Sequence, residues 1–214
     1  MLVRYFMTED PITIAPTDSL GNAHAVMKEK EIRRLPVVAE GVLVGIISSS
    51  DVDGILACGD ESRPAGVRFD ESWSERAVRE EMTPKPHICE IDTPLEEAAA
   101  LMRREKIGSL PVVKDREVIG IVTESDIFDA FTQLTYRGAA GKRICFRMPH
   151  SEKKAMFGKL FEACQRLDLE LLTILTHPLQ DTEHDLVTVR AAGERIEELV
   201  DEVWDLKYPV MRVD

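Results

Sequence analysis

The chain has 214 residues, more than one average domain and fewer than two large ones, so its length favours two small domains or one repeated unit. Hydrophobic residues make up 44% and charged residues 31% of the sequence, a balance that excludes disordered, collagen-like and membrane-bundle proteins. The 39 acidic residues outnumber the 27 basic ones and give a formal net charge of −12, which disfavours nucleic acid as a partner.

The start of the chain and its cysteines indicate the compartment. No apolar run approaches the roughly 20 residues that span a bilayer, and the first ten residues turn acidic before a signal-peptide core could form. The four cysteines are scattered without a C-x-x-C pair, which predicts reduced, buried thiols and neither a zinc site nor disulfides. We therefore expect a cytoplasmic protein without a membrane partner.

An internal repeat organises the first two thirds of the chain. Met7-Thr8 recurs as Met82-Thr83, a shift of 75 residues, and the same shift carries Leu35-Pro36-Val37-Val38 onto Leu110-Pro111-Val112-Val113. One copy, about 50 residues long, is too small to close a good core by itself. We therefore expect the two copies to pack against each other.

Each copy predicts the same order, β-α-β-β-α: a short extended segment, a helix with an apolar stripe, two strands around a polar turn, and a second helix. In the first copy these are 12–15, a helix from Leu20, the strands 35–38 and 42–47, and a helix that begins near Asp51. In the second copy they are 88–91, a helix from Leu95, two strands around residues 114–116, and a helix that begins near Asp126.

The second strand of each copy leads into the pattern G-h-h-[ST]-x-x-D, where h is an apolar residue. It stands here as Gly45-Ile46-Ile47-Ser48-Ser49-Ser50-Asp51 and Gly120-Ile121-Val122-Thr123-Glu124-Ser125-Asp126. Two such heptads at one fixed shift, each preceded by an L-P-V-V strand and an M-T opening, resemble a tandem pair of CBS domains, the Bateman module. The resemblance implies a pseudo-twofold disc that binds adenine nucleotides in two clefts, has no catalysis of its own and often dimerises.

The same resemblance assigns site residues. Asp51 and Asp126 would accept hydrogen bonds from ribose hydroxyls, with Ser48 and Thr123 beside them. The remaining predicted binding residues are Thr13, Ile14, Ile88 and Cys89, around the base, together with Pro36 and Pro111 of the two L-P-V-V strands. An alternative is that each Asp or Ser caps a helix and holds no ligand, although a cap uses one carboxylate oxygen and leaves the other free.

The two copies differ just before the L-P-V-V strand. Arg33-Arg34 stand there in the first copy and Gly108-Ser109 in the second. In some members of the family a basic residue at this place contacts phosphate, and a guanidinium matches phosphate oxygens well. We therefore predict two unequal clefts, with the cations supplied by the first copy. The alternative is that both arginines are solvated surface charges.

After Tyr136 the repeat stops, and the last third predicts a second β-α-β-β-α-β unit. Its predicted elements are the strand 143–148, the helix 153–167, the strands 170–175 and 185–190, the helix 194–206 and the strand 210–213. This order builds a ferredoxin-like sandwich and resembles the ACT domain. Gly158-Lys159-Leu160 resembles that family's helix-start motif, but Ala155 and Phe157 replace the Asp and Pro expected there. Amino-acid binding and a docking or dimerisation role stay open as alternatives.

The sequence as a whole predicts an α+β protein with CBS 1 at 1–60, a linker at 61–75, CBS 2 at 76–135, a hinge at 136–141 and an ACT-like domain at 142–214. A CBS pair followed by an ACT-like domain resembles the architecture of acetoin-utilisation accessory proteins.

The predicted function is a regulatory sensor, a homodimer that needs no cofactor and contacts a client enzyme or transporter. AMP, ADP or ATP is the first candidate ligand, ahead of S-adenosylmethionine and NAD. Two alternatives are a ligand-free interaction module and a hydrolase built on His177 and His184, which we expect in a polar turn between two strands.

Overall fold

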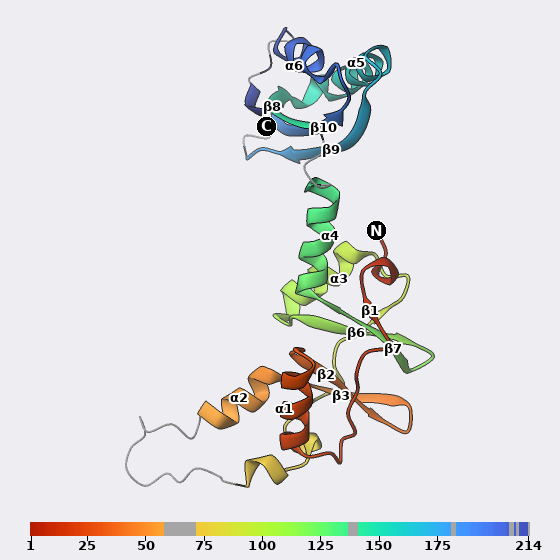
Figure 1. Cartoon of the computed structure of the whole chain (residues 1–214), viewed down its shortest axis with the longest axis vertical. Helices are drawn as coiled ribbons and strands as arrows, with labels where there is room; N and C mark the ends of the chain where they lie inside the picture. The colour runs from red at the N-terminus through yellow and green to blue at the C-terminus, as the bar shows by residue number, and fades with distance from the viewer. Residues whose placement is uncertain (58–71, 137–140, 181–182, 206–207, 209, 214) are drawn as a thin grey trace. The chain divides into compact units, whose positions relative to one another are not determined.

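The computed structural model describes residues 1–57, 72–136, 141–180, 183–205, 208 and 210–213. The protein is α+β, and its chain divides into two compact units, Met1–Phe128 and Asp129–Asp214 (Figure 1). Most of the predicted linker and hinge, and Cys58, lie outside the described residues, so the predicted domain boundaries stay predictions.

The two copies of the repeat fold alike. The first contains β1 (Thr8–Glu9), α1 (Leu20–Glu29), β2 (Arg34–Ala39), β3 (Val42–Ser48) and α2 (Ser49–Ala57). The second contains β4 (Thr83–Pro84), β5 (Cys89–Glu90), α3 (Leu95–Glu105), β6 (Ser109–Lys114), β7 (Glu117–Thr123) and α4 (Glu124–Tyr136). Turns of 3-10 helix stand at Val3–Tyr5, Trp73–Glu75 and Val78–Glu80. The predicted strands and helices are confirmed, whereas the extended segments are shorter than predicted.

The opening strand of each copy pairs with a strand of the other copy. β1 pairs antiparallel with β7, with Thr8 opposite Ile121, and β4 pairs in the same way with β3, with Thr83 opposite Ile46. In Figure 1, β1 accordingly runs beside the strands of the second copy. A reciprocal exchange of equivalent segments is what a twofold relation between the copies produces. Any hollow beside these strands is therefore built from both copies.

Two glycines allow this exchange. A Cβ on Gly120 would lie 2.6 Å from Sδ of Met7, and at Gly45 the equivalent methionine, Met82, lies closer still. Real Cβ atoms do not approach other atoms so closely, so the methionine of each M-T opening packs where the other copy's heptad has no side chain. The methionine of each M-T motif thus contacts the glycine of the G-h-h motif in the other copy.

The apolar stripes of the helices face the core, as predicted. Leu20, Ala23 and Met27 of α1 are buried, and so are their counterparts 75 residues later, Leu95, Ala98 and Met102 of α3. Ser19 caps α1 by accepting a hydrogen bond from the backbone N–H of Asn22 at 3.2 Å. Burial of each such side chain stabilises the fold by roughly 1.5–3 kcal/mol, less for alanine.

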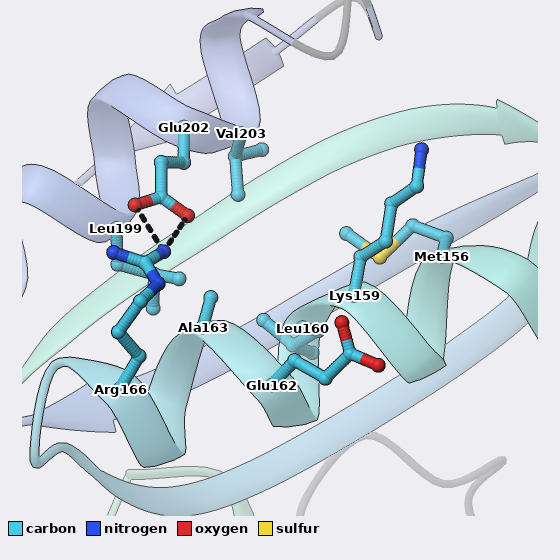
Figure 2. Close-up of a pocket in the computed structure, with 9 residues that line it drawn as sticks. All are labelled: Met156, Lys159, Leu160, Glu162, Ala163, Arg166, Leu199, Glu202 and Val203. Carbon is cyan, nitrogen blue, oxygen red and sulfur yellow. Dashed lines mark hydrogen bonds and ion pairs between the residues drawn. The ribbon is translucent and has the colours of Figure 1, made fainter.

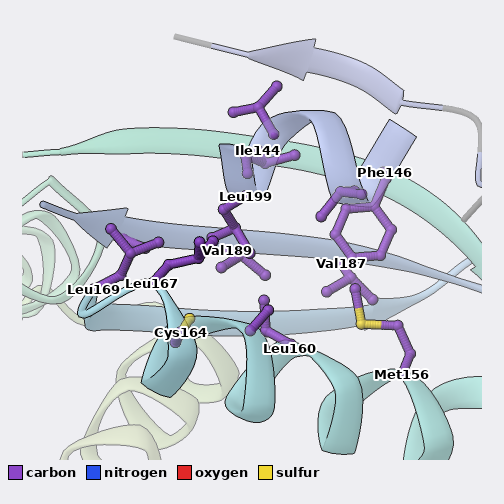
Figure 3. Close-up of a cluster of buried hydrophobic side chains, with 14 of the residues drawn as sticks. Ile144, Phe146, Met156, Leu160, Cys164, Leu167, Leu169, Val187, Val189 and Leu199 are labelled. Carbon is purple, nitrogen blue, oxygen red and sulfur yellow. The ribbon is translucent and has the colours of Figure 1, made fainter. Parts of the chain in front are cut away.

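The second unit has the predicted order of elements. They are β8 (Lys142–Pro149), α5 (Lys153–Arg166), β9 (Glu170–Pro178), β10 (His184–Ala192), α6 (Ile196–Asp205) and β11 (Val210–Val213). The sheet order is β11-β8-β10-β9, with every pair antiparallel. Residues of β8 and β10 alternate into a core that α5 and α6 cover, as Figure 3 shows for Phe146, Val187 and Leu160.

The predicted placement of the two loop histidines is wrong. His177 lies in β9 and His184 in β10, because both strands extend beyond their predicted ends. Within the described ranges, no helix combines the length and the apolar composition needed to cross a bilayer.

Candidate functional site

Two clefts of equal size, each about 510 Å³, lie in the first unit. Cleft A is lined by Thr8, Asp10, Pro11, Ile12, Glu31, Ile32, Arg33, Arg34, Gly108, Ile121, Thr123, Glu124 and Ser125. Cleft B is lined by Arg34, Ile46, Ser48, Ser50, Asp51, Thr83, Pro84, Lys85, Pro86, His87, Lys106, Ile107, Gly108 and Ser109. Because the opening strands are exchanged, each cleft combines the opening of one copy with the heptad of the other.

A Ser/Thr–Asp pair stands at the start of one helix beside each cleft. Oδ2 of Asp51 accepts hydrogen bonds from the backbone N–H and the hydroxyl of Ser48, at 2.8 and 2.7 Å. Oδ2 of Asp126 accepts the same pair of bonds from Thr123, at 2.7 and 2.8 Å. This is the capping-box arrangement, with the carboxylate at the third helical position. Among the described residues, neither Oδ1 has a hydrogen-bond partner, so the cap and a ligand can share one carboxylate.

The predicted site residues fall into two groups. Those that line a cleft are Arg33, Arg34, Ser48, Asp51 and Thr123. Those outside both linings are Thr13, Ile14, Pro36, Ile88, Cys89, Pro111 and Asp126, although Asp126 is bonded to Thr123. The opening segments reach the clefts one residue earlier than predicted, through Ile12 and His87, because Ile14 and Cys89 turn into the core.

Two charged residues that line cleft A have residues of opposite charge at the equivalent positions of cleft B. Asp10 and Glu31 in cleft A correspond, 75 residues on, to Lys85 and Lys106 in cleft B. All four have left-handed backbone, with φ between 45° and 57°. Cleft A has three acidic side chains against two arginines, whereas cleft B has three basic side chains against Asp51.

This reversal corrects the reasoning about phosphate. The clefts differ in charge, as predicted, but both copies supply cations and the more basic cleft is the one that Asp51 lines. Lys85 and Lys106 were not predicted, because each cleft is built from both copies and not from one. Comparing charges at the 75-residue shift would have found both lysines.

Arg34 lines both clefts, and so does Gly108. A Cβ on Gly108 would come to 3.0 Å from Cζ of Arg34 and still nearer to its Nη2, so the guanidinium lies directly against this glycine. In the part of the chain that the structure describes, the side chain of Arg34 makes no hydrogen bond or ion pair. A half-buried cation without a partner at the wall between two clefts is suited to meet an anion.

The family profile described as "CBS domain" matches residues 3–57 and 78–133, which together are just over half of the chain. The chain belongs to the CBS domain family. The match ends at residue 133, so residues beyond the CBS pair have no family assignment.

Curated relatives match a little more than half of this chain. A homoserine O-acetyltransferase of Methanohalobium evestigatum is 37% identical over 123 residues, which are 56% of this chain and 22% of that protein. An inosine-5′-monophosphate dehydrogenase of Korarchaeum cryptofilum is 36% identical over 124 residues, 58% of this chain and 23% of that protein. This chain therefore spans less than a quarter of the length of either relative.

Solved structures resemble the same region. The CBS domain pair of protein MJ0100 in complex with 5′-methylthioadenosine and S-adenosyl-L-methionine is 32% identical, with a TM-score of 0.52 over 61% of this chain and 95% of that one. CBSX2 in complex with AMP is 28% identical, with a TM-score of 0.51 over 62% of this chain and 97% of that one. A putative acetoin utilization protein (AcuB) from Vibrio cholerae is 30% identical, with a TM-score of 0.52 over 65% of this chain and 97% of that one.

The second unit has a hollow of its own, a groove of about 370 Å³ between α5 and α6. Its floor is apolar, with Leu160, Ala163 and Leu199. At one end Nη2 of Arg166 donates to both carboxylate oxygens of Glu202, each at 2.6 Å (Figure 2). Among the residues with described positions, no three His, Cys, Asp or Glu side chains gather as metal ligands would.

Proposed function

We propose that the protein is a regulatory sensor whose CBS pair binds adenosyl ligands of the AMP, ADP or ATP type and which has no catalysis of its own. The observation that carries the proposal is Asp51 in cleft B. Its Oδ2 is held by the cap, which fixes the carboxylate, and its Oδ1 is available to ribose hydroxyls. Relatives solved with AMP and with S-adenosylmethionine support the ligand class.

The basic residues of cleft B favour a phosphorylated ligand there. Lys85, Lys106 and Arg34 line the same cleft as Asp51, and none of the three has an ion pair among the described residues. Phosphate oxygens would therefore find cations that no carboxylate already neutralises. The same reasoning favours AMP, ADP or ATP over S-adenosylmethionine, whose sulfonium is positive.

Thermal melts in the presence of AMP, ADP, ATP, NAD and S-adenosylmethionine test the proposal. A ligand at 100 times its Kd should stabilise the CBS pair by about 2.7 kcal/mol, which raises Tm by several degrees. Asp51→Asn should reduce that shift, because an amide oxygen can still accept the capping bonds while its NH₂ group cannot accept from ribose. Absence of any shift with all five compounds would refute the sensor function.

The second candidate is a ligand-free interaction module. It is favoured by the completeness of both capping boxes, which hold Asp51 and Asp126 without a ligand. In that case Asp51→Asn and Asp126→Asn would leave every ligand titration unchanged.

For the second unit we propose a ferredoxin-like, ACT-like fold with a role in dimerisation, in binding a second effector or in contacting a client enzyme or transporter. The order β11-β8-β10-β9 with both helices over one face supports the fold. The groove between α5 and α6 supports a binding role (Figure 2). We also propose a homodimer, which the exposed Phe128 and Phe131 of α4 support, since large apolar side chains this exposed often lie in interfaces. Light scattering of the full chain tests the dimer.

A further inference from the structure

Arg34 and Gly108 are the two residues that line both clefts. Arg34 stands at the start of β2, where its backbone is paired with Ser48 of β3, and the preceding carbonyl, that of Arg33, accepts a hydrogen bond from Ser49 N at 2.8 Å. The base of the side chain is therefore fixed. The guanidinium lies against Gly108 of the other copy, and that glycine also lines both clefts.

The second copy has no matching cation. The position equivalent to Arg34 is Ser109, which is buried and whose short side chain carries no charge. The pseudo-twofold relation thus duplicates the clefts and their capping boxes but leaves one central guanidinium for both. A long, unpaired arginine beside a glycine can turn to either side, yet it can place its fork on only one phosphate at a time.

We propose that Arg34 couples the two clefts negatively for phosphate-bearing ligands. The proposal rests on the proposed function, because it assumes that both clefts accept adenosyl ligands. A phosphate in cleft B, where Lys85 and Lys106 already favour it, draws the guanidinium to that side. The lining of cleft A then keeps one arginine, Arg33, and three acidic residues, so a second phosphate binds there more weakly, by roughly 5-fold to 150-fold, the usual range of coupling between sites.

The coupling distinguishes ligands by charge. A ligand without phosphate does not compete for Arg34, so 5′-methylthioadenosine should bind cleft A equally well whether cleft B is filled with AMP or empty. Because coupling between binding sites is reciprocal, a phosphate held in cleft A must weaken cleft B by the same factor.

The test is a double-mutant cycle read by calorimetric titration of the full chain with AMP. Lys85→Asp with Lys106→Glu places in cleft B the residues that stand at the equivalent positions of cleft A, where the same left-handed backbone already holds Asp10 and Glu31. In the unaltered chain we expect a tight AMP binding event in cleft B and a weak one in cleft A. This variant should lose the tight event. The remaining event should become about tenfold tighter than the weak event of the unaltered chain, since Arg34 is released to cleft A.

The sign of this change separates coupling from simple charge effects. Added carboxylates alone would weaken phosphate binding in cleft A, whereas release of Arg34 strengthens it. In an Arg34→Gln background the gain should vanish. Arg33→Gln is the matched control: Arg33 lines cleft A alone, so its loss should weaken that event while the gain persists.

Three results would overturn the inference. A remaining event that is no tighter than before, or a gain that survives Arg34→Gln, would show that the clefts are independent, and the proposed function would stand. A chain that binds no AMP in either cleft would remove the proposed function and the coupling together.

Discussion

Gly108 makes the space that the guanidinium of Arg34 fills. A Cβ at position 108 would lie 3.0 Å from Cζ of Arg34, nearer to Nη2, and 3.0 Å from Oε2 of Glu124. Both neighbours are the far ends of flexible side chains, and the backbone of Gly108 is not in the left-handed region. The glycine is therefore explained by the arginine it accommodates and not by a turn.

Gly108→Ala should consequently affect binding more than stability. The added methyl group displaces the guanidinium from the wall between the clefts, so AMP affinity should change severalfold while Tm stays within a few degrees. Gly54→Ala is the control, because a Cβ there meets nothing within 4 Å and alanine favours the helix α2 by about 1 kcal/mol. Titration and thermal melts of both variants check the prediction. Equal AMP affinity in Gly108→Ala and the unaltered chain would contradict it.

A second prediction uses the left-handed residue that ends α3. Lys106 has φ 57°, a conformation that costs an L-residue about 1–2 kcal/mol and that glycine adopts freely. Lys106→Gly should therefore leave the free energy of unfolding unchanged or raise it by up to about 1 kcal/mol. It should weaken AMP binding in cleft B because a cation is lost.

Glu31→Gly is the matched variant for this prediction. Glu31 stands at the equivalent position with φ 53° and opposite charge, so its replacement should give a similar stability change and tighten phosphate binding in cleft A. The same affinity change in both variants would show that backbone freedom, not charge, controls binding.

Local patterns were enough to predict most of the fold. The 75-residue repeat, the apolar stripes of α1 and α3 and the strand pairs β2–β3 and β6–β7 depend on periodicity and short turns, which the sequence records directly. The exchange of β1 and β4 does not depend on such local patterns. It pairs Thr8 with Ile121 across more than a hundred residues, and no local pattern specifies that partner.

The site was predicted less well for the same reason. Asp51 and Ser48 belong to one helix start, so their geometry follows from the heptad. Lys85 and Lys106 line the same cleft as Asp51 only through tertiary pairing, so the local pattern predicted Arg33 and Arg34 but not these two lysines. The histidines 177 and 184 were misplaced because strand length depends on packing against neighbours and not on composition.

The cysteines give a prediction on reactivity. Burial raises the pKa of the Cys89 thiol to about 11, and burial together with the charge of Glu202 raises the pKa of Cys164. At pH 8 both should be almost entirely protonated and should react slowly with iodoacetamide, since the thiolate is the nucleophile. Half-buried Cys145 should be labelled faster. Peptide mass spectrometry of native and urea-unfolded protein measures the three rates, and labelling of native Cys89 as fast as Cys145 would contradict the prediction.

The last prediction concerns acid stability of the second unit. Asp185 of β10 is fully buried, and its Oδ2 lies 2.9 Å from both Nζ of Lys153 and Nδ1 of His150. The hydrogen bond from Lys153, followed by the smaller contributions of the Lys153 charge and of His150, lowers the pKa of this carboxyl below its ordinary value. A depressed folded-state pKa contributes stability above the unfolded value, about 3.9, and that contribution is lost as the pH falls through the folded value.

Asp185→Asn should therefore be less stable than the unaltered chain at pH 7, and the two should converge as the pH falls below about 4. Urea unfolding at pH 7, 5 and 3, followed by circular dichroism, measures the difference. Asp168→Asn makes the same chemical change at an exposed position and should show no convergence. A deficit in Asp185→Asn that stays constant from pH 7 to pH 3 would mean that Asp185 acts through its shape and packing, because only a charge interaction with Lys153 and His150 disappears when the carboxyl is protonated.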